Sequence, residues 1–243
     1  MLSFITSCAE IKVYTPSSKF TSPEAAGKLF AGNASIGLDR GTEGIVSLEN
    51  DRTDNPLEMN NDNSQLMTSF DLGLMEKLDV FTKVTFGSPT LVGLKYQVYG
   101  EARENAGKGN TSVSITYAGG GSGESASGSS IFFDSDVNQY DLSHRANDFS
   151  IIVGHRFEED TLTYVTLSRT SNIVNISLEA DSAPLNGADF EISSVTNGLN
   201  LGLVRYWRKM YVNIEGAIQE NEWSNTDKIT YGLINISLGI KWD

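Results

Sequence analysis

The sequence predicts an all-β protein folded as a single antiparallel barrel of about ten strands. In five segments the apolar residues recur at every second position, which is the side-chain period of a strand. The segment 23–30 (PEAAGKLF) is suited to no more than a turn or two of helix. The clearest alternation runs to the penultimate residue of the chain and consists of Ile234, Ile236, Leu238, Ile240 and Trp242.

The four other alternating segments share one property with the last: their apolar faces carry no charged residue. These segments are 65–75, 77–86, 90–100 and 209–219. A soluble β-sandwich or barrel would turn its apolar face inward. A transmembrane barrel has the opposite arrangement, with apolar side chains toward lipid and polar ones toward the lumen. The period alone leaves both architectures open.

The connections favour the membrane architecture, because short and long ones alternate along the chain. The predicted tight connections are 75–77, 158–160 and 207–209, with a moderate one at 101–109. The long polar connections are 51–64, 119–148, 181–190 and 220–228, and 87–90 is a short member of the same set. Taking 29–49 and 161–180 as one strand each gives ten strands, with all tight turns at one end, as in membrane barrels. Splitting both gives twelve strands, the alternative count.

Aromatic residues fall into two groups near the two ends of the predicted strands. Two such belts are typical of the two interfaces of a membrane. The alternative is that aromatic residues are common in strands of any kind. The group beside the tight turns is Phe157, Tyr206, Trp207, Tyr211 and Trp242, and the other is Phe86, Tyr117, Phe149 and Tyr231.

The C-terminal stripe has the length and pattern of a transmembrane strand. It spans 234–242, close to the ~9–11 residues that a tilted strand needs to cross a bilayer. Leu238, Ile240 and Trp242 resemble the C-terminal assembly signal of bacterial outer-membrane β-barrel proteins. Asp243 departs from that signal, which usually ends on the aromatic residue itself. The resemblance implies a barrel in the outer membrane of a Gram-negative bacterium.

The other terminus resembles the lipobox of bacterial lipoproteins, in which residues 5–7 (ITS) directly precede Cys8. The resemblance implies that Cys8 carries a lipid and that Ala9 after it directs the protein to the outer membrane. The basic and most of the apolar part of a signal peptide do not precede it, so an ordinary thiol stays open. The expected divisions are a truncated signal at 1–8, a periplasmic tether at 9–27 and the barrel at 28–243.

Composition excludes several classes of protein. Acidic residues number 31 and basic residues 18, for a net charge of -13, which argues against a nucleic-acid partner. The chain has no apolar run of about 18 residues that would form a transmembrane helix. The single cysteine excludes an internal disulfide framework and a cysteine-cluster metal site.

Candidate chemistry is sparse, and we expect neither an enzyme nor a cofactor. Asp134, Asp136 and Asn138 have the first ligand spacings of a calcium loop, but Gln139 and Arg145 occupy positions where an EF-hand needs glycine and glutamate. They remain a weak calcium candidate. A hydrolase at the barrel rim is the enzyme alternative, for which Asp141 and His144 do not have the D-x-H spacing of known surface proteases.

These observations predict a structural or interaction scaffold, or a subunit of an envelope assembly, held in outer-membrane lipid. A ten-stranded lumen is narrow, and charges of both signs inside it should pair and block it. The predicted lumen charges are Asp71, Lys83, Lys95, Arg156, Glu215 and Lys241, and the predicted inward set also includes Tyr99 and Tyr211. An apolar triplet in the longest outer connection, Ile131, Phe132 and Phe133, is the predicted contact for a protein partner. The alternatives are a narrow channel and a soluble periplasmic ligand-binding barrel.

Overall fold

A computed structural model describes residues 9–48, 57–127, 137–180, 188–224 and 228–242. These residues form eleven strands, and no helix occurs among them. Within the described ranges there is therefore no helix long and apolar enough to cross a membrane. The strands are β1 (Ala9–Pro16), β2 (Gly32–Leu48), β3 (Leu57–Met75), β4 (Leu78–Thr85), β5 (Thr90–Tyr99), β6 (Thr111–Ser127), β7 (Val137–Glu158), β8 (Thr161–Ala180), β9 (Ala188–Trp207), β10 (Met210–Trp223) and β11 (Ile229–Trp242).

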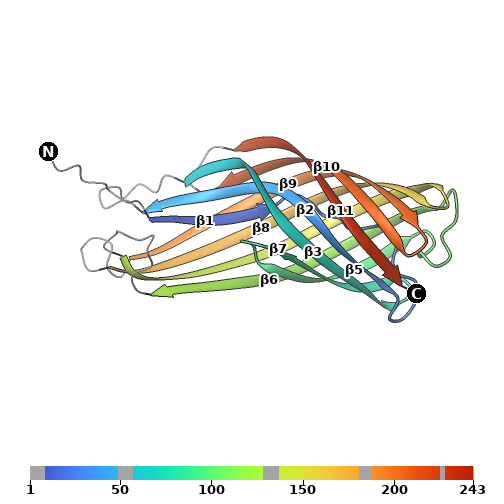
Figure 1. The fold of residues 1–243 in the computed structure, drawn as a ribbon, viewed down its shortest axis with the longest axis horizontal. Coiled ribbons are helices and arrows are strands. Elements are labelled where there is room, and N and C mark those ends of the chain that lie inside the picture. Colours follow the sequence, from blue (N-terminus) through green and yellow to red (C-terminus); the bar gives the residue numbers. More distant parts are fainter. Residues whose placement is uncertain (1–8, 49–56, 128–136, 181–187, 225–227, 243) are drawn as a thin grey trace.

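Strands β2 to β11 form a closed antiparallel barrel (Figure 1). Each strand pairs with its neighbours in sequence, and β2 closes the barrel by pairing with both β3 and β11. The all-β fold with ten barrel strands is confirmed. The twelve-stranded alternative is wrong, because β2 and β8 each continue without a break through the segments that it would split.

The barrel has two dissimilar ends (Figure 1). The connections β3–β4, β5–β6, β7–β8 and β9–β10 lie at one end, together with the end of β11, and we call this the turn end. The other end, the loop end, receives the remaining connections between barrel strands. The predicted grouping of the tight turns at one end is therefore confirmed. The predicted bounds of the long connections are wrong, because strand pairing continues into them: β3 begins at Leu57, β6 runs to Ser127, β7 begins at Val137 and β10 runs to Trp223.

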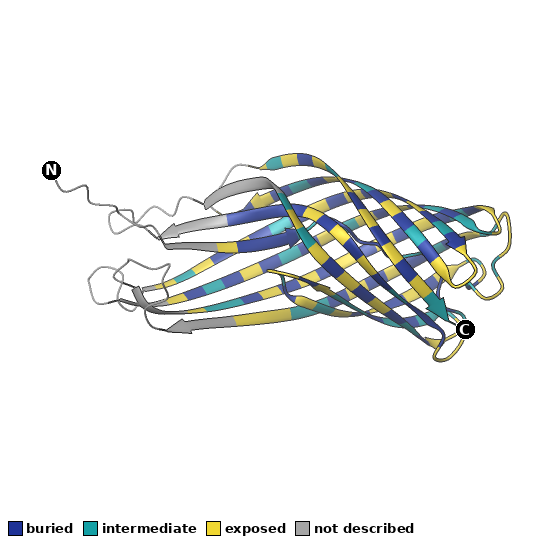
Figure 2. Cartoon of the chain, viewed as in Figure 1, coloured by how far each residue is buried: buried dark blue, intermediate teal, exposed yellow. Residues whose placement is uncertain are grey.

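Exposed and buried residues alternate along the barrel strands (Figure 2). Outward positions are filled by large apolar side chains, and inward positions are mostly polar. On β10, for example, Ile214 and Ile218 are exposed, whereas Asn213 and Glu215 are buried. This arrangement is the inverse of a soluble barrel, whose apolar side chains fill the interior.

The aromatic belt at the turn end is smaller than predicted. Phe157 and Trp207 face outward, and Trp242 is half-buried with its indole N–H donating to a backbone carbonyl. Tyr206 and Tyr211 face the lumen, so their assignment to a membrane interface is wrong. Neighbours in a strand point to opposite faces, so Tyr206 and Trp207 cannot share one.

The belt toward the loop end shows the same mixture. Phe86, Tyr117 and Phe149 are exposed on the outside. Tyr231 is buried inside the barrel, where its hydroxyl donates to Gln219 Oε1 over 2.9 Å. Its predicted place near a membrane interface is therefore wrong too.

The N-terminal segment departs most from expectation. Residues 9–16 are strand β1, which pairs with the last part of β2, and residues 17–26 are almost all buried. The prediction of a tether outside the barrel at 9–27 is wrong. The segment is instead bound by the barrel.

Candidate functional site

Strand β1 runs antiparallel beside the loop-end part of β2 (Figure 1). It occupies the edge of β2 that β11 leaves free, because the β2–β11 pairing ends at Leu38. The consecutive residues Val13, Tyr14 and Thr15 are all buried, so both faces of β1 are covered, unlike those of a wall strand. The amide of Tyr14 donates to the Gly87 carbonyl in the β4–β5 connection over 3.1 Å. Strand β1 therefore joins β2 to that connection.

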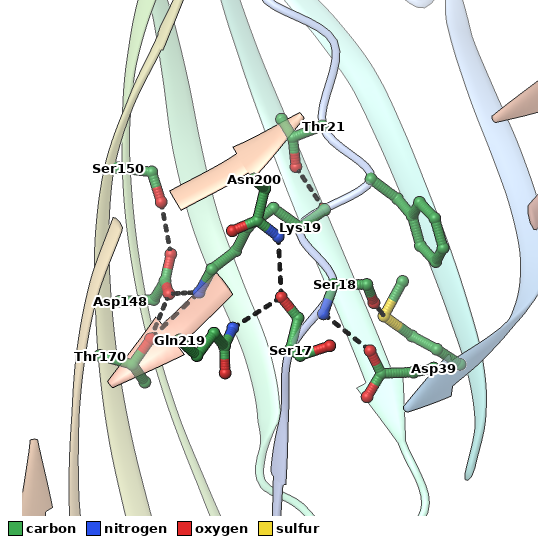
Figure 3. A network of polar contacts seen from close by, with 12 residues as sticks. Ser17, Ser18, Lys19, Thr21, Asp39, Asp148, Ser150, Thr170, Asn200 and Gln219 are labelled. Carbon is green, nitrogen blue, oxygen red and sulfur yellow. Dashed lines mark hydrogen bonds and ion pairs between the residues drawn. The ribbon is translucent and has the colours of Figure 1, made fainter. Parts of the chain in front are cut away.

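After Pro16 the chain enters the lumen, and we call residues 17–27 the plug. The plug belongs to no strand, so its backbone polar groups need partners from other parts of the molecule. Side chains of the barrel wall supply many of them (Figure 3). The buried residues of the plug are Ser17, Ser18, Lys19, Phe20, Thr21, Pro23, Glu24, Ala25 and Ala26.

Amide and carboxylate side chains hold the first two residues of the plug. The Ser17 carbonyl accepts hydrogen bonds from Asn200 Nδ2 at 2.9 Å and Gln219 Nε2 at 2.8 Å. The Ser18 amide donates to Asp39 Oδ1 over 2.7 Å. Acceptor and donor groups of this part of the plug are thus matched by three strands of the wall.

Lys19 is the cation of the plug and lies among acidic groups. Its ammonium forms a buried ion pair with the Asp148 carboxylate and donates to Thr170 Oγ1 over 3.1 Å. The amides of Lys19 and Phe20 donate to the two carboxylate oxygens of Glu215, at 2.7 and 3.0 Å. Phe20 has a φ of 42°, which lets these consecutive amides point toward one carboxylate.

The Glu215 carboxylate depends on the plug for half of its hydrogen bonds. Besides the two plug amides it accepts from the Tyr164 hydroxyl at 2.8 Å and from Asn200 Nδ2 at 2.7 Å. Its side chain is fully buried. A buried carboxylate is stable only when it is paired or well hydrogen-bonded, so removal of the plug would leave Glu215 poorly satisfied.

Glu24 is the anion of the plug and lies among basic groups. Arg156 binds its carboxylate with two nitrogens, at 2.9 and 2.5 Å, and Asn110 Nδ2 donates to it over 3.1 Å. Lys95 donates to the Glu24 carbonyl over 3.0 Å. Arg156 and Glu24 are both buried, so this two-point ion pair fixes the plug at a second site.

The end of the plug is held by amide contacts. The Ala25 amide donates to Gln97 Oε1 over 2.7 Å, and the Ala26 amide lies 3.1 Å from each oxygen of Asp79. Asp79 in turn pairs with Lys95 at 2.9 Å. Asp79 and Lys95, which bind backbone groups of the plug, thus also form an ion pair with each other.

The charges of plug and wall are complementary along the lumen. The Lys19 ammonium pairs with Asp148, and the Glu24 carboxylate pairs with Arg156. Glu215 and Lys95 instead bind backbone groups of the plug, the Lys19 amide and the Glu24 carbonyl. A reversed segment would bring like charges together, so this pattern fixes the direction and register of the plug.

Little space remains beside Lys19. A cavity of about 20 Å³ there is lined by Lys83, Asp148, Asn172 and other residues. That volume holds about one water molecule. This cavity is therefore too small for a solute larger than water.

The predicted lumen charges lie inside the barrel but do not form one network. Asp71, Lys95, Arg156 and Glu215 are buried, and Lys83 and Lys241 are half-buried. Tyr211 is buried as its inward prediction requires, whereas Tyr99 is exposed and its inward prediction is wrong. Lys95 and Arg156 belong to separate ion pairs, Glu215 binds plug amides, and the Lys241 ammonium lies 5.1 Å from the Tyr206 ring centre.

Sequence reasoning missed the partners that organise these residues. They are Lys19, Glu24, Asp39, Asp79 and Asp148. Lys19 and Glu24 lie in the segment expected to be a tether, and Asp148 lies at the end of a predicted loop. Asp79 could have been predicted, because the sequence places its charge on the polar face of a strand.

Some of the other candidate residues lie outside the described residues, and the side chains of the rest are not brought together in one site. Asp141 is exposed and His144 is buried, on opposite faces of β7, and His144 Nε2 lies 3.2 Å from Asn172 Oδ1. The described residues contain no cluster of three or more metal-ligating side chains. Asn138 is in β7. Cys8, Ile131, Phe132, Phe133, Asp134 and Asp136 lie outside the described residues.

Comparison with known protein families and with curated proteins finds no match for this chain.

Proposed function

We propose that the protein is an outer-membrane β-barrel closed by its own N-terminal segment, serving as a structural or interaction scaffold. The observation that carries this proposal is the apolar outer face. Outward residues such as Leu94, Leu201, Ile234 and Leu238 are each more than half exposed. Water-soluble monomers rarely expose a continuous apolar surface of this kind, whereas lipid stabilises it.

The filled lumen favours a scaffold over the channel alternative. Opening a channel would require the plug to leave, and Asp148, Glu215 and Arg156 would each lose a charged or amide partner. Removing one partner of a buried ion pair costs about 3–5 kcal/mol, and the plug contains two such pairs. A closed barrel offers its loops, not its lumen, to other molecules.

The loop end faces the outside of the cell in this proposal, because membrane barrels have short periplasmic turns and longer external loops. Ala9 pairs with Leu48 at the loop end. A lipid on Cys8, one residue before Ala9, then inserts from the external side of the membrane. An epitope placed directly before Ala9 should bind antibody on intact cells. Binding only after permeabilisation would reverse this orientation.

The partner is a protein of the cell envelope that binds the loop end. Its proposed contact is the apolar triplet at 131–133, since exposed apolar clusters often mark interaction sites. Replacement of the triplet by serine should abolish recovery of that partner after crosslinking on intact cells. Unchanged crosslinking would assign the contact to another part of the surface.

Membrane fractionation tests the location directly. We expect the protein in the membrane pellet, with release by detergent and not by high salt or alkaline carbonate. Recovery in the soluble fraction without detergent would contradict the proposal and favour a soluble barrel. Planar-bilayer recording of the purified protein tests closure, for which we expect no stable conductance steps.

A further inference from the structure

A shallow groove crosses the outer face of β9, β10 and β11. Its walls are the exposed apolar side chains Leu199, Leu201, Ile218 and Ile234. Its volume is about 500 Å³, and Arg40 of β2 lies at its rim. The groove therefore combines an apolar floor with one cation.

Two outward-facing glycines create the groove. Gly216 stands between Ile234 of β11 and Leu201 of β9, and Gly232 is paired with Ile218 of β10. An added Cβ at Gly216 would meet no atom within 4 Å, and at Gly232 the nearest would be a carbonyl oxygen at 3.9 Å. Neither glycine has a positive φ. Internal packing and backbone conformation therefore do not explain why side chains are missing from these two positions.

The backbone of Arg40 is held in place, and its side chain is exposed on the outer face. Its amide donates to Asn235 Oδ1 over 2.7 Å, and its carbonyl accepts from the Ser17 hydroxyl. The guanidinium forms no hydrogen bond or ion pair with any residue in the described ranges. On the outside of β2, Arg40 follows Ile36 and Leu38, so it stands where the apolar surface of that strand ends.

We propose that this groove binds one membrane lipid with a phosphorylated head group. An acyl chain lies over Gly216 and Gly232, and the phosphate accepts hydrogen bonds from the Arg40 guanidinium. This inference rests on the proposed membrane location, which surrounds the groove with lipid. Charge complementarity favours a lipid over a second copy of the chain, because no acidic residue lines the groove to pair with a copy's Arg40.

Lipid retention by the purified full-length protein tests the inference. The protein is extracted from membranes in mild detergent, and bound phospholipid and lipopolysaccharide are quantified by native mass spectrometry. Arg40→Gln removes the phosphate contact, and Gly216→Leu fills the groove without changing its apolar character. Arg169→Gln is the matched control, because Arg169 is an exposed outward arginine on β8 that does not line the groove.

We expect bound lipid per protein to fall about tenfold in Arg40→Gln, as for loss of a charge-assisted contact. It should also fall in Gly216→Leu, because the new side chain occupies the groove, and should stay unchanged in Arg169→Gln. Equal retention in all proteins, or an equal fall in the control, would overturn the specific groove. A wild-type dimer that Gly216→Leu dissociates would identify a second copy as the occupant and overturn the lipid. The proposed membrane location fails separately, through recovery of the wild-type protein in the soluble fraction.

Discussion

Replacement of Lys19 by methionine should loosen the plug while leaving the barrel intact. Lys19 contributes one buried ammonium, and its removal leaves the Asp148 carboxylate with hydroxyl donors from Thr170 at 2.7 Å and Ser150 at 3.1 Å. Breaking a buried ion pair costs about 3–5 kcal/mol. The two remaining donors place the expected cost at the lower limit, about 3 kcal/mol.

The barrel wall retains its own hydrogen-bond ladders, so this cost falls on docking of the plug. At ~1.4 kcal/mol per factor of ten, ~3 kcal/mol raises the population of undocked plug by about 150-fold. Hydrogen exchange read by mass spectrometry measures that population through the amides of Ser18, Lys19 and Phe20. Their exchange should accelerate by about two orders of magnitude, while peptides from β7 to β9 exchange as in the wild type.

Lys28→Met is the matched control for the loss of a lysine near the plug. Its ammonium lies 3.9 Å from Glu104, and both side chains are about half exposed. Exposed pairs of this kind contribute about 0–1 kcal/mol, so exchange of the plug amides should change by less than about fivefold. Equal exchange in Lys19→Met and Lys28→Met would refute the assignment of Lys19 as an anchor. Free-chain exchange rates in the wild type would refute the docked plug itself.

Three further outcomes are expected. Ile236→Arg, at an outward position, should lower the free energy of unfolding in lipid by about 2–4 kcal/mol if it lies near the bilayer midplane. Asn197→Arg should lower it by less than about 1 kcal/mol. Equal urea midpoints for the two variants would argue against lipid on this face. Glu24→Gln keeps the shape of the side chain but removes the negative charge that pairs with Arg156. The plug amides near Ala25 should therefore exchange faster by at least about tenfold. Glu104→Gln should leave their exchange unchanged. Protease added to intact cells should cut within 119–148 and spare 101–109, and the opposite cleavage pattern would reverse the orientation of the barrel.

The barrel could be predicted from local pattern because membrane strands repeat every two residues. The outward row of β11, including Ile236 and Leu238, and the inward position of Glu215 both follow from that parity. Parity also predicts an inward Tyr211, because it stands between the outward residues Met210 and Val212. Proximity to a turn suggested an interface, but the alternation decides which face a side chain occupies.

The plug could not be predicted in the same way, because its structure depends on contacts remote in sequence. Residues 17–27 have no period, and their Ser and Pro content is typical of a linker. Lys19 binds Asp148, and Glu24 binds Arg156 across 132 residues. Only the closed barrel brings these partners together. The lumen supplies hydrogen-bond partners, as water does. A segment bound in it therefore has a polar composition like that of a tether in water.

The central claim is a barrel with lipid outside and its own N-terminal segment inside. Spin labels at each position of 163–170 in β8, in a Cys8→Ser background reconstituted in bilayers, test both halves at once. Labels at outward positions such as Val165 and Leu167 should collide with oxygen, and labels at inward positions such as Thr166 should be accessible neither to oxygen nor to a water-soluble nickel complex. Outward labels that collide with the nickel complex would contradict the membrane-facing surface, and inward labels that do so would contradict the closed lumen.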